Sequence, residues 1–333
     1  MLSILKEYGE YPGKYRHIIW RTILQLPENN NSFIELLKKG QHSCVENFDK
    51  MYPLKDISAL RNLKKIISCL SFLSKVFAEI DYLPRFVFPF LQIYPREINL
   101  CFETVATILL NQCQLWFEFV PMEPYNYLGM IENILGELEP NLMRFYCERK
   151  ITTKIYAFAL MENAMSEVFD ENQWLQLWDN IVSNQPYYFL FCIVAYNVIQ
   201  KNVIMKLDGH HSIEQFFHDQ SNIEFKKFID KTYELMDKTC PDHLHPKQYI
   251  KNFEPLAKGQ YQYFTNYPKH LINNKCTEID TLRMENKAIN AKMRELEKAE
   301  INLSERLEKN LKAEEHEKRM KGFLFIVYLI SCQ

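Results

Sequence analysis

A metal site is the first chemistry to consider, because Cys240, His243 and His245 lie within six residues of one another. Structural zinc sites combine two ligand pairs at characteristic spacings, and this run has no second pair. The prolines at 241 and 246 are typical of a turn instead. We therefore expect no metal site. The nine cysteines include no Cys-x-x-Cys pair and no signal peptide opens the chain, which indicates a reduced, cytoplasmic protein.

Cofactor binding and covalent catalysis have no motif to support them. The chain has no Gly-x-x-x-x-Gly-Lys-[Ser/Thr], Gly-x-Ser-x-Gly or Gly-x-Gly-x-x-Gly sequence. Cys101 and Cys192 lie in apolar helical runs, where a thiol behaves as a small hydrophobic side chain, although a cysteine nucleophile stays open. The formal charge of −2 gives no attraction to nucleic acid. We expect no cofactor and no nucleic-acid partner.

Two segments combine tryptophan with a charged residue at helical spacing. In the first, Trp174 and Trp178 lie four residues apart on one helical face, and Asp179 follows directly. In the second, Arg16 precedes Trp20 by four residues. We expect the three tryptophans to anchor the core, each with an indole N–H that needs an acceptor. Arg16 and Asp179 are expected to cap helix ends or to pair with groups nearby.

These residues need a helical frame, and the composition provides one. Hydrophobic residues make up 47% of the chain and glycines number only eight, which disfavours both disorder and a turn-rich β fold. Apolar residues recur at three- and four-residue intervals, as in Ile66, Leu70, Leu73 and Phe77. Prolines divide this pattern into helices of ordinary length. The sequence predicts an all-α fold.

Composition also divides the chain into parts. Residues 1–205 form the predicted helical domain, and residues 206–255 a helical extension. The aromatic linker, residues 256–275, has no clear period, and we expect it to lie across the body or to form a docking strand. The charged segment 276–320 follows. The last part, residues 321–333, is an apolar tail too short for the roughly 20 residues of a membrane span. We interpret it as an artefact of the gene model, the alternative being a tail that dips into a membrane.

The segment 276–320 has the narrow apolar seam of a coiled coil. Its seam residues alternate steps of three and four over roughly four heptads: Leu282, Asn286, Ile289, Met293, Leu296, Leu303 and Leu307. Glu300 occupies the missing seam position, and an asparagine in a seam favours one register. The pattern predicts a homodimer or a heteromeric coiled coil. A single helix packed on the body is the alternative.

The tryptophan segments together resemble the TBC domain family, whose members accelerate GTP hydrolysis by Rab GTPases. Arg16 and Trp20 are similar to the family's opening helix. The run from Trp174 to Asp179, followed by Pro186, is similar to its Trp-Leu-x-Leu-Trp-Asp signature. The resemblance covers about residues 8–205, and it implies a two-lobed helical domain with a groove that binds a Rab.

Further segments resemble the family members that carry WD repeats before the TBC domain and a coiled coil after it. They are Tyr8-Gly-Glu-Tyr-Pro12, Leu24-Gln-Leu-Pro-Glu28 and Lys258-Gly-Gln-Tyr261. This chain begins at the TBC domain, so we expect it to be an isoform, a fragment or a partial gene product. The resemblance also implies action at the centrosome and its centriolar satellites, in cilium assembly.

Family catalysis rests on an arginine in Ile-x-x-Asp-x-x-Arg and a glutamine in Tyr-x-Gln, which neutralise the phosphoryl group and position water. None of the nineteen tyrosines here has glutamine two residues later. Phe102 and Glu103 stand where the glutamine is expected, and a carboxylate repels phosphate. Arg61 has the wrong offset for the arginine finger, and Arg85 lies too near the glutamine position.

The sequence therefore predicts a catalytically impaired TBC scaffold, not an enzyme, that binds protein partners through its helical groove and coiled coil. Two alternatives stay open. One is an active GTPase-activating protein that uses Arg61 or Arg85 as a displaced finger. The other is an effector that binds a Rab GTPase without accelerating hydrolysis.

Overall fold

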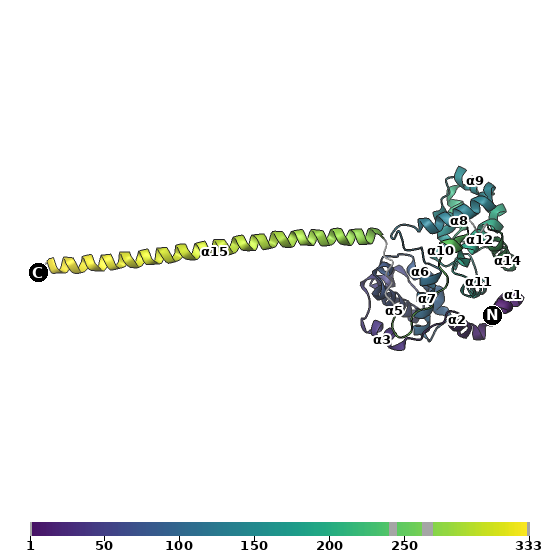
Figure 1. The fold of residues 1–333 in the computed structure, drawn as a ribbon, viewed down its shortest axis with the longest axis horizontal. Helices are drawn as coiled ribbons and strands as arrows, with labels where there is room; N and C mark the ends of the chain where they lie inside the picture. The colour runs from purple at the N-terminus through teal and green to yellow at the C-terminus, as the bar shows by residue number, and fades with distance from the viewer. Residues whose placement is uncertain (1, 240–244, 262–268, 332–333) are drawn as a thin grey trace. The chain divides into compact units, whose positions relative to one another are not determined.

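The computed structural model describes residues 2–239, 245–261 and 269–331 and divides the chain into two compact units, residues 1–269 and 270–333 (Figure 1). Side chains of the C-terminal helix are described at 281–315 and 318–320. In these ranges every regular element is a helix and no strand occurs. The predicted all-α class and the long C-terminal helix are confirmed.

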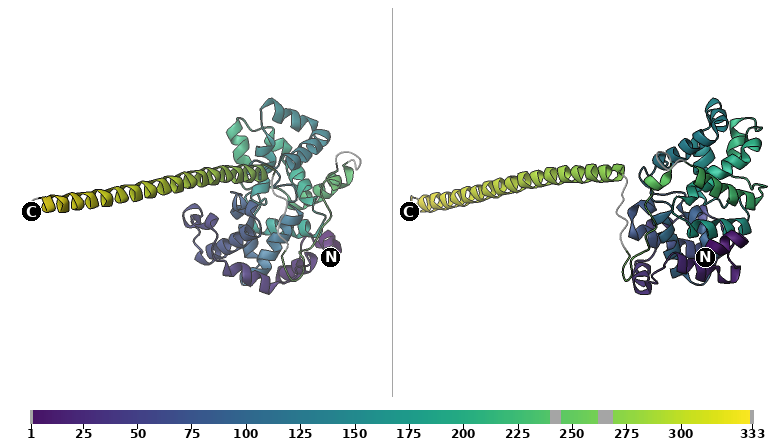
Figure 2. Two further views of the ribbon diagram at one scale, coloured as in Figure 1. Left: turned by 60° about the vertical axis from the view of Figure 1, so that its left-hand side comes forward. Right: turned by 45° about the vertical axis from the view of Figure 1, so that its right-hand side comes forward.

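The first unit contains two groups of helices, which Figures 1 and 2 show in purple to blue and in teal to green. The first group comprises α1 (Leu2–Tyr8), α2 (Arg16–Ile23), α3 (Asn30–Lys38), α4 (Phe48–Met51), α5 (Ile57–Leu73), α6 (Leu83–Val87) and α7 (Ile98–Asn111). The second comprises α8 (Tyr125–Leu138), α9 (Pro140–Glu148), α10 (Ala159–Glu162), α11 (Glu171–Ser183), α12 (Tyr188–Ile204), α13 (His210–Phe216) and α14 (Phe225–Lys238). Helix α11 packs against α1 and α2, so it joins the two groups.

Local chemistry explains where several of these helices begin. Asp56 caps α5 by accepting hydrogen bonds from the N–H groups of Ser58 and Ala59. Asp170 and Gln173 form a reciprocal capping box at the start of α11. Pro140 occupies the first turn of α9, where its missing N–H costs no helical hydrogen bond.

Helices α7 and α12 form the centre of the two groups. Both are buried nearly all round, as expected for helices whose sequences lack a polar face. Helix α14 packs along α12, so the predicted extension 206–255 belongs to the first unit. An aromatic cluster fills the space between α6, α11 and α12. Its members are Phe86, Phe90, Trp116, Trp174, Trp178 and Phe189.

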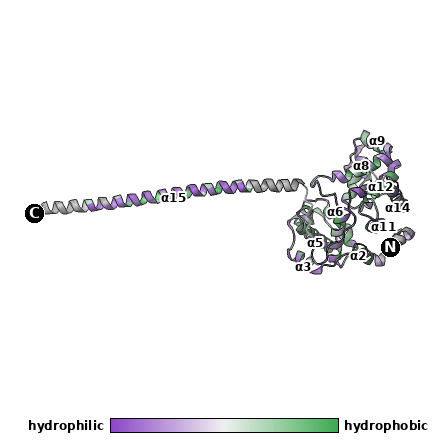
Figure 3. Ribbon diagram, in the orientation of Figure 1, coloured by the Kyte–Doolittle hydropathy of each residue, from purple (hydrophilic) through white to green (hydrophobic). Residues whose placement is uncertain are grey.

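The described part of the second unit is one helix, α15 (Lys269–Ser331), whose first residue still belongs to the first unit. Figure 3 shows its described part as mostly hydrophilic, with hydrophobic residues recurring along it. No helix in the described part of the chain is long and apolar enough to cross a membrane. The apolar tail predicted at 321–333 lies outside the residues whose side chains are described.

Candidate functional site

One buried carboxylate connects the two tryptophan segments. Asp179, on α11, is fully buried and accepts the indole N–H of Trp20 at 2.7 Å and the backbone N–H of Tyr11 at 2.8 Å. The Nε of Arg16 lies 3.0 and 3.1 Å from its two oxygens. Burial raises the pKa of Asp179, while the bonds from Arg16, Tyr11 and Trp20 oppose that rise. Both carboxylate oxygens of Asp179 accept hydrogen bonds from the protein, so Asp179 is a structural joint between α11 and the first tryptophan segment.

The other two tryptophans share one acceptor. The indole N–H groups of Trp174 and Trp178 both donate to the carbonyl of Ala164, at 2.9 and 3.2 Å. Ala164 and Met165 have φ angles of 55° and 61°, a region that L-residues seldom occupy. Because two indoles meet the carbonyl, they hold this turn in its left-handed conformation. The indole N–H groups of Trp174 and Trp178 are therefore both used in contacts inside the fold.

Phe102 and Glu103, at the expected glutamine position, are both fully buried in α7. Glu103 Oε2 accepts the N–H of Glu28 at 2.9 Å, and its Oε1 accepts the N–H of Asn29 at 2.8 Å. The hydroxyl of Tyr261 also donates to Oε1, at 2.7 Å. Burial, followed by the bond to Glu103, raises the pKa of Tyr261. The carboxylate is therefore occupied by three donors inside the fold.

Tyr261 ends a segment, residues 250–261 and here called the strap, which crosses α7 and α3 without forming a helix or strand. Asparagine and glutamine side chains hold its backbone. Gln114 binds the N–H and carbonyl of Lys251 at 2.8 and 2.9 Å, and Asn111 binds those of Glu254 at 2.8 and 3.0 Å.

Asn29 and Ser32, at the beginning of α3, also bind the backbone of the strap. Asn29 donates to the carbonyl of Ala257 at 2.8 Å and accepts the N–H of Gly259 at 2.7 Å. The hydroxyl of Ser32 donates to the carbonyl of Gly259, also at 2.7 Å. The first six residues of the predicted linker 256–275 therefore lie across the body, and they cover Phe102 and Glu103.

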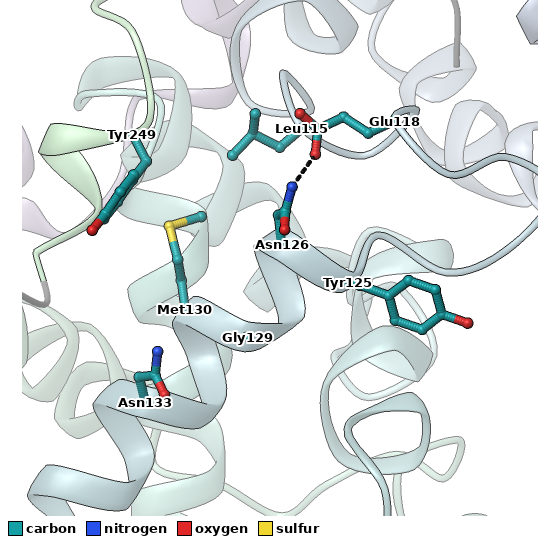
Figure 4. A pocket seen from close by; sticks show the side chains of 8 residues that line it. All are labelled: Leu115, Glu118, Tyr125, Asn126, Gly129, Met130, Asn133 and Tyr249. Atoms are coloured by element: carbon teal, nitrogen blue, oxygen red, sulfur yellow. Dashed lines mark hydrogen bonds between the residues drawn. The ribbon is translucent and has the colours of Figure 1, made fainter. Parts of the chain in front are cut away.

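A cavity of about 540 Å³ lies beside α8, close to the beginning of the strap (Figure 4). Asn126 points toward Glu118 and donates to it at 2.7 Å, while Met130 and Asn133 follow on the same helix. Tyr249 lines the cavity from the segment before the strap. Among the described residues that line it, Glu118 carries the charge and the others are polar or apolar.

No family model matches the chain. Two curated relatives are TBC1 domain family member 31 from Homo sapiens, 40% identical over 280 residues, and from Xenopus tropicalis, 39% identical over 283 residues. These matches cover 84% and 85% of this chain and 26% of each relative. The chain belongs to the TBC domain family. It spans about a quarter of the length of those relatives.

Solved structures confirm the two-lobed TBC fold. The Ypt/Rab-GAP domain of Gyp1p superposes with a TM-score of 0.58 at 13% identity, covering 68% of this chain and 88% of that one. The Chlamydomonas flagellar RabGAP TBC domain superposes with a TM-score of 0.55 at 12% identity, covering 68% and 80%. At such identities the likeness concerns the TBC fold alone.

The two arginines considered as displaced fingers of the TBC domain lie in different settings. Arg61 is exposed on α5. Arg85, on α6, pairs with Glu162 at 3.0 Å beside a cavity of about 180 Å³. Burial raises the pKa of Glu162, and the charge of Arg85 opposes this. The guanidinium of Arg85 is thus engaged by a carboxylate of the same chain.

The structure places the seven seam residues on α15, where the six apolar ones are 52–63% exposed. Within the described residues, no group of three His, Cys, Asp or Glu could hold a metal ion. Cys240 and His243 lie outside the described residues. His245 is buried against the rings of Tyr187 and Phe191.

Sequence reasoning missed the residues that hold the strap. Asn111 is the last residue of the largely apolar helix α7 and Gln114 follows it in the next turn, and this change to polar residues was the available signal. The role of Asn29 had no signal, because its contacts depend on a segment more than 220 residues away.

Proposed function

We propose that this chain is a catalytically impaired TBC-domain scaffold. One observation carries the proposal, the burial of Glu103 beneath Tyr261 at the position where the resemblance predicts a glutamine finger. A catalytic glutamine must reach the attacking water, whereas this carboxylate meets two backbone N–H groups and a phenol. A negative charge there also opposes the negative charge of a phosphoryl group.

Loss of the arginine finger supports the same proposal. An arginine finger contributes about 10³–10⁵ in rate, so docking alone does not replace it. The motif Ile-x-x-Asp-x-x-Arg does not occur in the TBC region of the sequence. Arg85, the stronger substitute, is held by Glu162, and its release would leave that partly buried carboxylate without its partner.

The helices of the TBC fold are held together by contacts that need no catalytic group, as a binding scaffold requires. The joint at Asp179 and the shared carbonyl of Ala164 keep the TBC fold without any catalytic group. We propose that its helical groove binds protein, a Rab GTPase included, and that α15 recruits a second helix through its seam. On the resemblance described above, we propose the centrosome and its satellites as the place of action, in cilium assembly. Co-localisation of the tagged chain with a centrosome marker tests this placement.

Single-turnover GTP hydrolysis across a panel of Rab GTPases tests the absence of catalysis. The panel is measured with the intact chain and with Arg61→Ala, Arg85→Ala and the exposed control Arg96→Ala. We expect no acceleration by any of the four proteins. Acceleration that is lost in Arg61→Ala or Arg85→Ala, and kept in Arg96→Ala, would establish a displaced finger and overturn the proposal.

A binding measurement separates the scaffold from a Rab effector. An effector binds the GTP-loaded Rab more tightly than the GDP-loaded Rab and leaves the hydrolysis rate unchanged. Affinities for each Rab loaded with GDP or with a non-hydrolysable GTP analogue give this ratio directly.

A further inference from the structure

The seam of α15 has the regularity of one specific pairing. Leu282, Ile289, Leu296 and Leu303 follow one another at seven-residue intervals and occupy the d positions of a heptad. The a positions, also seven apart, are Asn286, Met293, Glu300 and Leu307. The apolar members are more than half exposed on α15, so a stripe about 25 residues long is open to a second helix.

We propose that a second copy of this chain covers the stripe, as a parallel coiled coil in exact register. The proposal rests on the proposed role of α15 as an assembly helix and names its partner. It also names the direction and the alignment of that partner, which the polar residues of the seam determine.

Asn286 determines the direction. In a parallel, in-register pair, each a position lies beside the same a position of the other copy, so the two Asn286 amides donate to and accept from each other. In an antiparallel pair, by contrast, an a position lies beside a d position. All four d residues from Leu282 to Leu303 are apolar, so the amide would be buried without a partner, which is costly.

The charges that flank the seam favour the same arrangement. In a parallel pair each g position approaches the e position five residues further along the other copy. Lys292 thereby meets Glu297 of the second copy, twice in each dimer. The other such pairs in the described stripe are Glu285 with Asn290, Ala299 with Ser304 and Arg306 with Leu311, none of them like-charged.

Glu300 limits the strength of this dimer. In register, two Glu300 carboxylates face each other in the seam, and like charges there oppose association. The stripe therefore encodes a specific dimer that is weaker than its leucines alone would give. Replacing Glu300 with leucine is expected to tighten the dimer at least tenfold, because a repulsive layer becomes an apolar one.

Sedimentation of the full chain over a range of concentrations tests the proposal. We expect a monomer–dimer equilibrium that Ile289→Lys weakens by at least about a hundredfold, because two buried isoleucines are lost from each dimer. The matched control is Met284→Lys, which adds the same charge on the outer face and leaves the dimer unchanged. A monomer at all concentrations would overturn the proposal, and so would equal effects of the two variants.

Charge reversal and spin labels test the direction. Lys292→Glu alone is expected to weaken the dimer several-fold, and Lys292→Glu combined with Glu297→Lys to restore it. Labels at Lys312→Cys are expected at about the 10 Å separation of paired helices plus the label length. Antiparallel pairing that places Met293 beside Leu296 of the other copy would put them roughly 52 Å apart and overturn the assigned direction. All these outcomes are independent of the GTP hydrolysis that tests the scaffold.

Discussion

Asp179 shows how one residue of the family signature can serve structure alone. Its carboxylate receives donors from the segment before α2 and from α2 itself, through Tyr11, Arg16 and Trp20. These partners lie more than 150 residues away in the sequence, so the bond network ties the chain's beginning to α11. Burial strengthens each bond and also makes the loss of one partner costly.

We predict that Asp179→Asn lowers the free energy of unfolding by about 3 kcal/mol, because the buried Arg16 loses its buried counter-charge and keeps only the exposed carboxylate of Glu10. Urea unfolding followed by circular dichroism measures the change. Asp208→Asn, at a side chain that is 99% exposed, is the matched control and should change little. Equal effects of the two variants would show that the joint has no special role.

Glu103 offers a second test at this scale. Replacing it with glutamine introduces the residue type that the resemblance predicts at this position. It also turns an NH₂ group toward one of the donors whose hydrogen bond the carboxylate now accepts. We predict that Glu103→Gln lowers the free energy of unfolding by about 1–3 kcal/mol, without producing GTP hydrolysis. Glu132→Gln, on the exposed face of α8, is the control. A gain of hydrolysis in Glu103→Gln would mean that the position is open to a bound Rab.

At the scale of elements, the strap is held by side chains that bind its backbone. Asn29, Asn111 and Gln114 each engage both an N–H and a carbonyl of the strap. Such contacts satisfy backbone groups that burial would otherwise leave unpaired. The strap enters through the turn Pro246–Gln248, which His245 caps by accepting the N–H of Lys247 at 3.1 Å.

We predict that acidification weakens this entry turn. Burial, followed by the charge of Lys247, lowers the pKa of His245 below its ordinary value of 6.5. The unfolded chain then binds the proton more readily, so the stability due to His245 is present above pH 6.5 and is lost as pH falls through the lowered pKa. Thermal unfolding between about pH 7.5 and about pH 5.5 should therefore show a larger loss in the wild type than in His245→Gln. Parallel curves for the two proteins would exclude this contribution.

The helices could be predicted from the sequence because their signals are local. Spacing places Trp174 beside Trp178, and seven-residue intervals identify the long C-terminal helix. The strap could not be predicted, because Tyr261 and Glu103 are 158 residues apart and their contact depends on the finished fold. The acceptor role of the Ala164 carbonyl could not be predicted either. Neither alanine nor methionine is a residue type that indicates a left-handed turn.

At the scale of the whole molecule, the first unit keeps the TBC fold and closes its expected catalytic position, while the second presents a helix with an open seam. Because the strap covers Glu103, this position could be inactive in itself or inactive only while the strap lies over it. Asn29→Ala combined with Asn111→Ala removes the amides that bind Ala257, Gly259 and Glu254, and so loosens the cover.

The central claim is that this TBC domain does not catalyse GTP hydrolysis. The most direct test is the single-turnover rate constant of each Rab at saturating concentration of the intact chain, beside the Asn29→Ala/Asn111→Ala variant. We predict the intrinsic rate of the Rab in both cases, because Glu103 supplies no catalytic group even when uncovered. Acceleration by either protein, toward the roughly 10³–10⁵ that an arginine finger contributes, would contradict the claim.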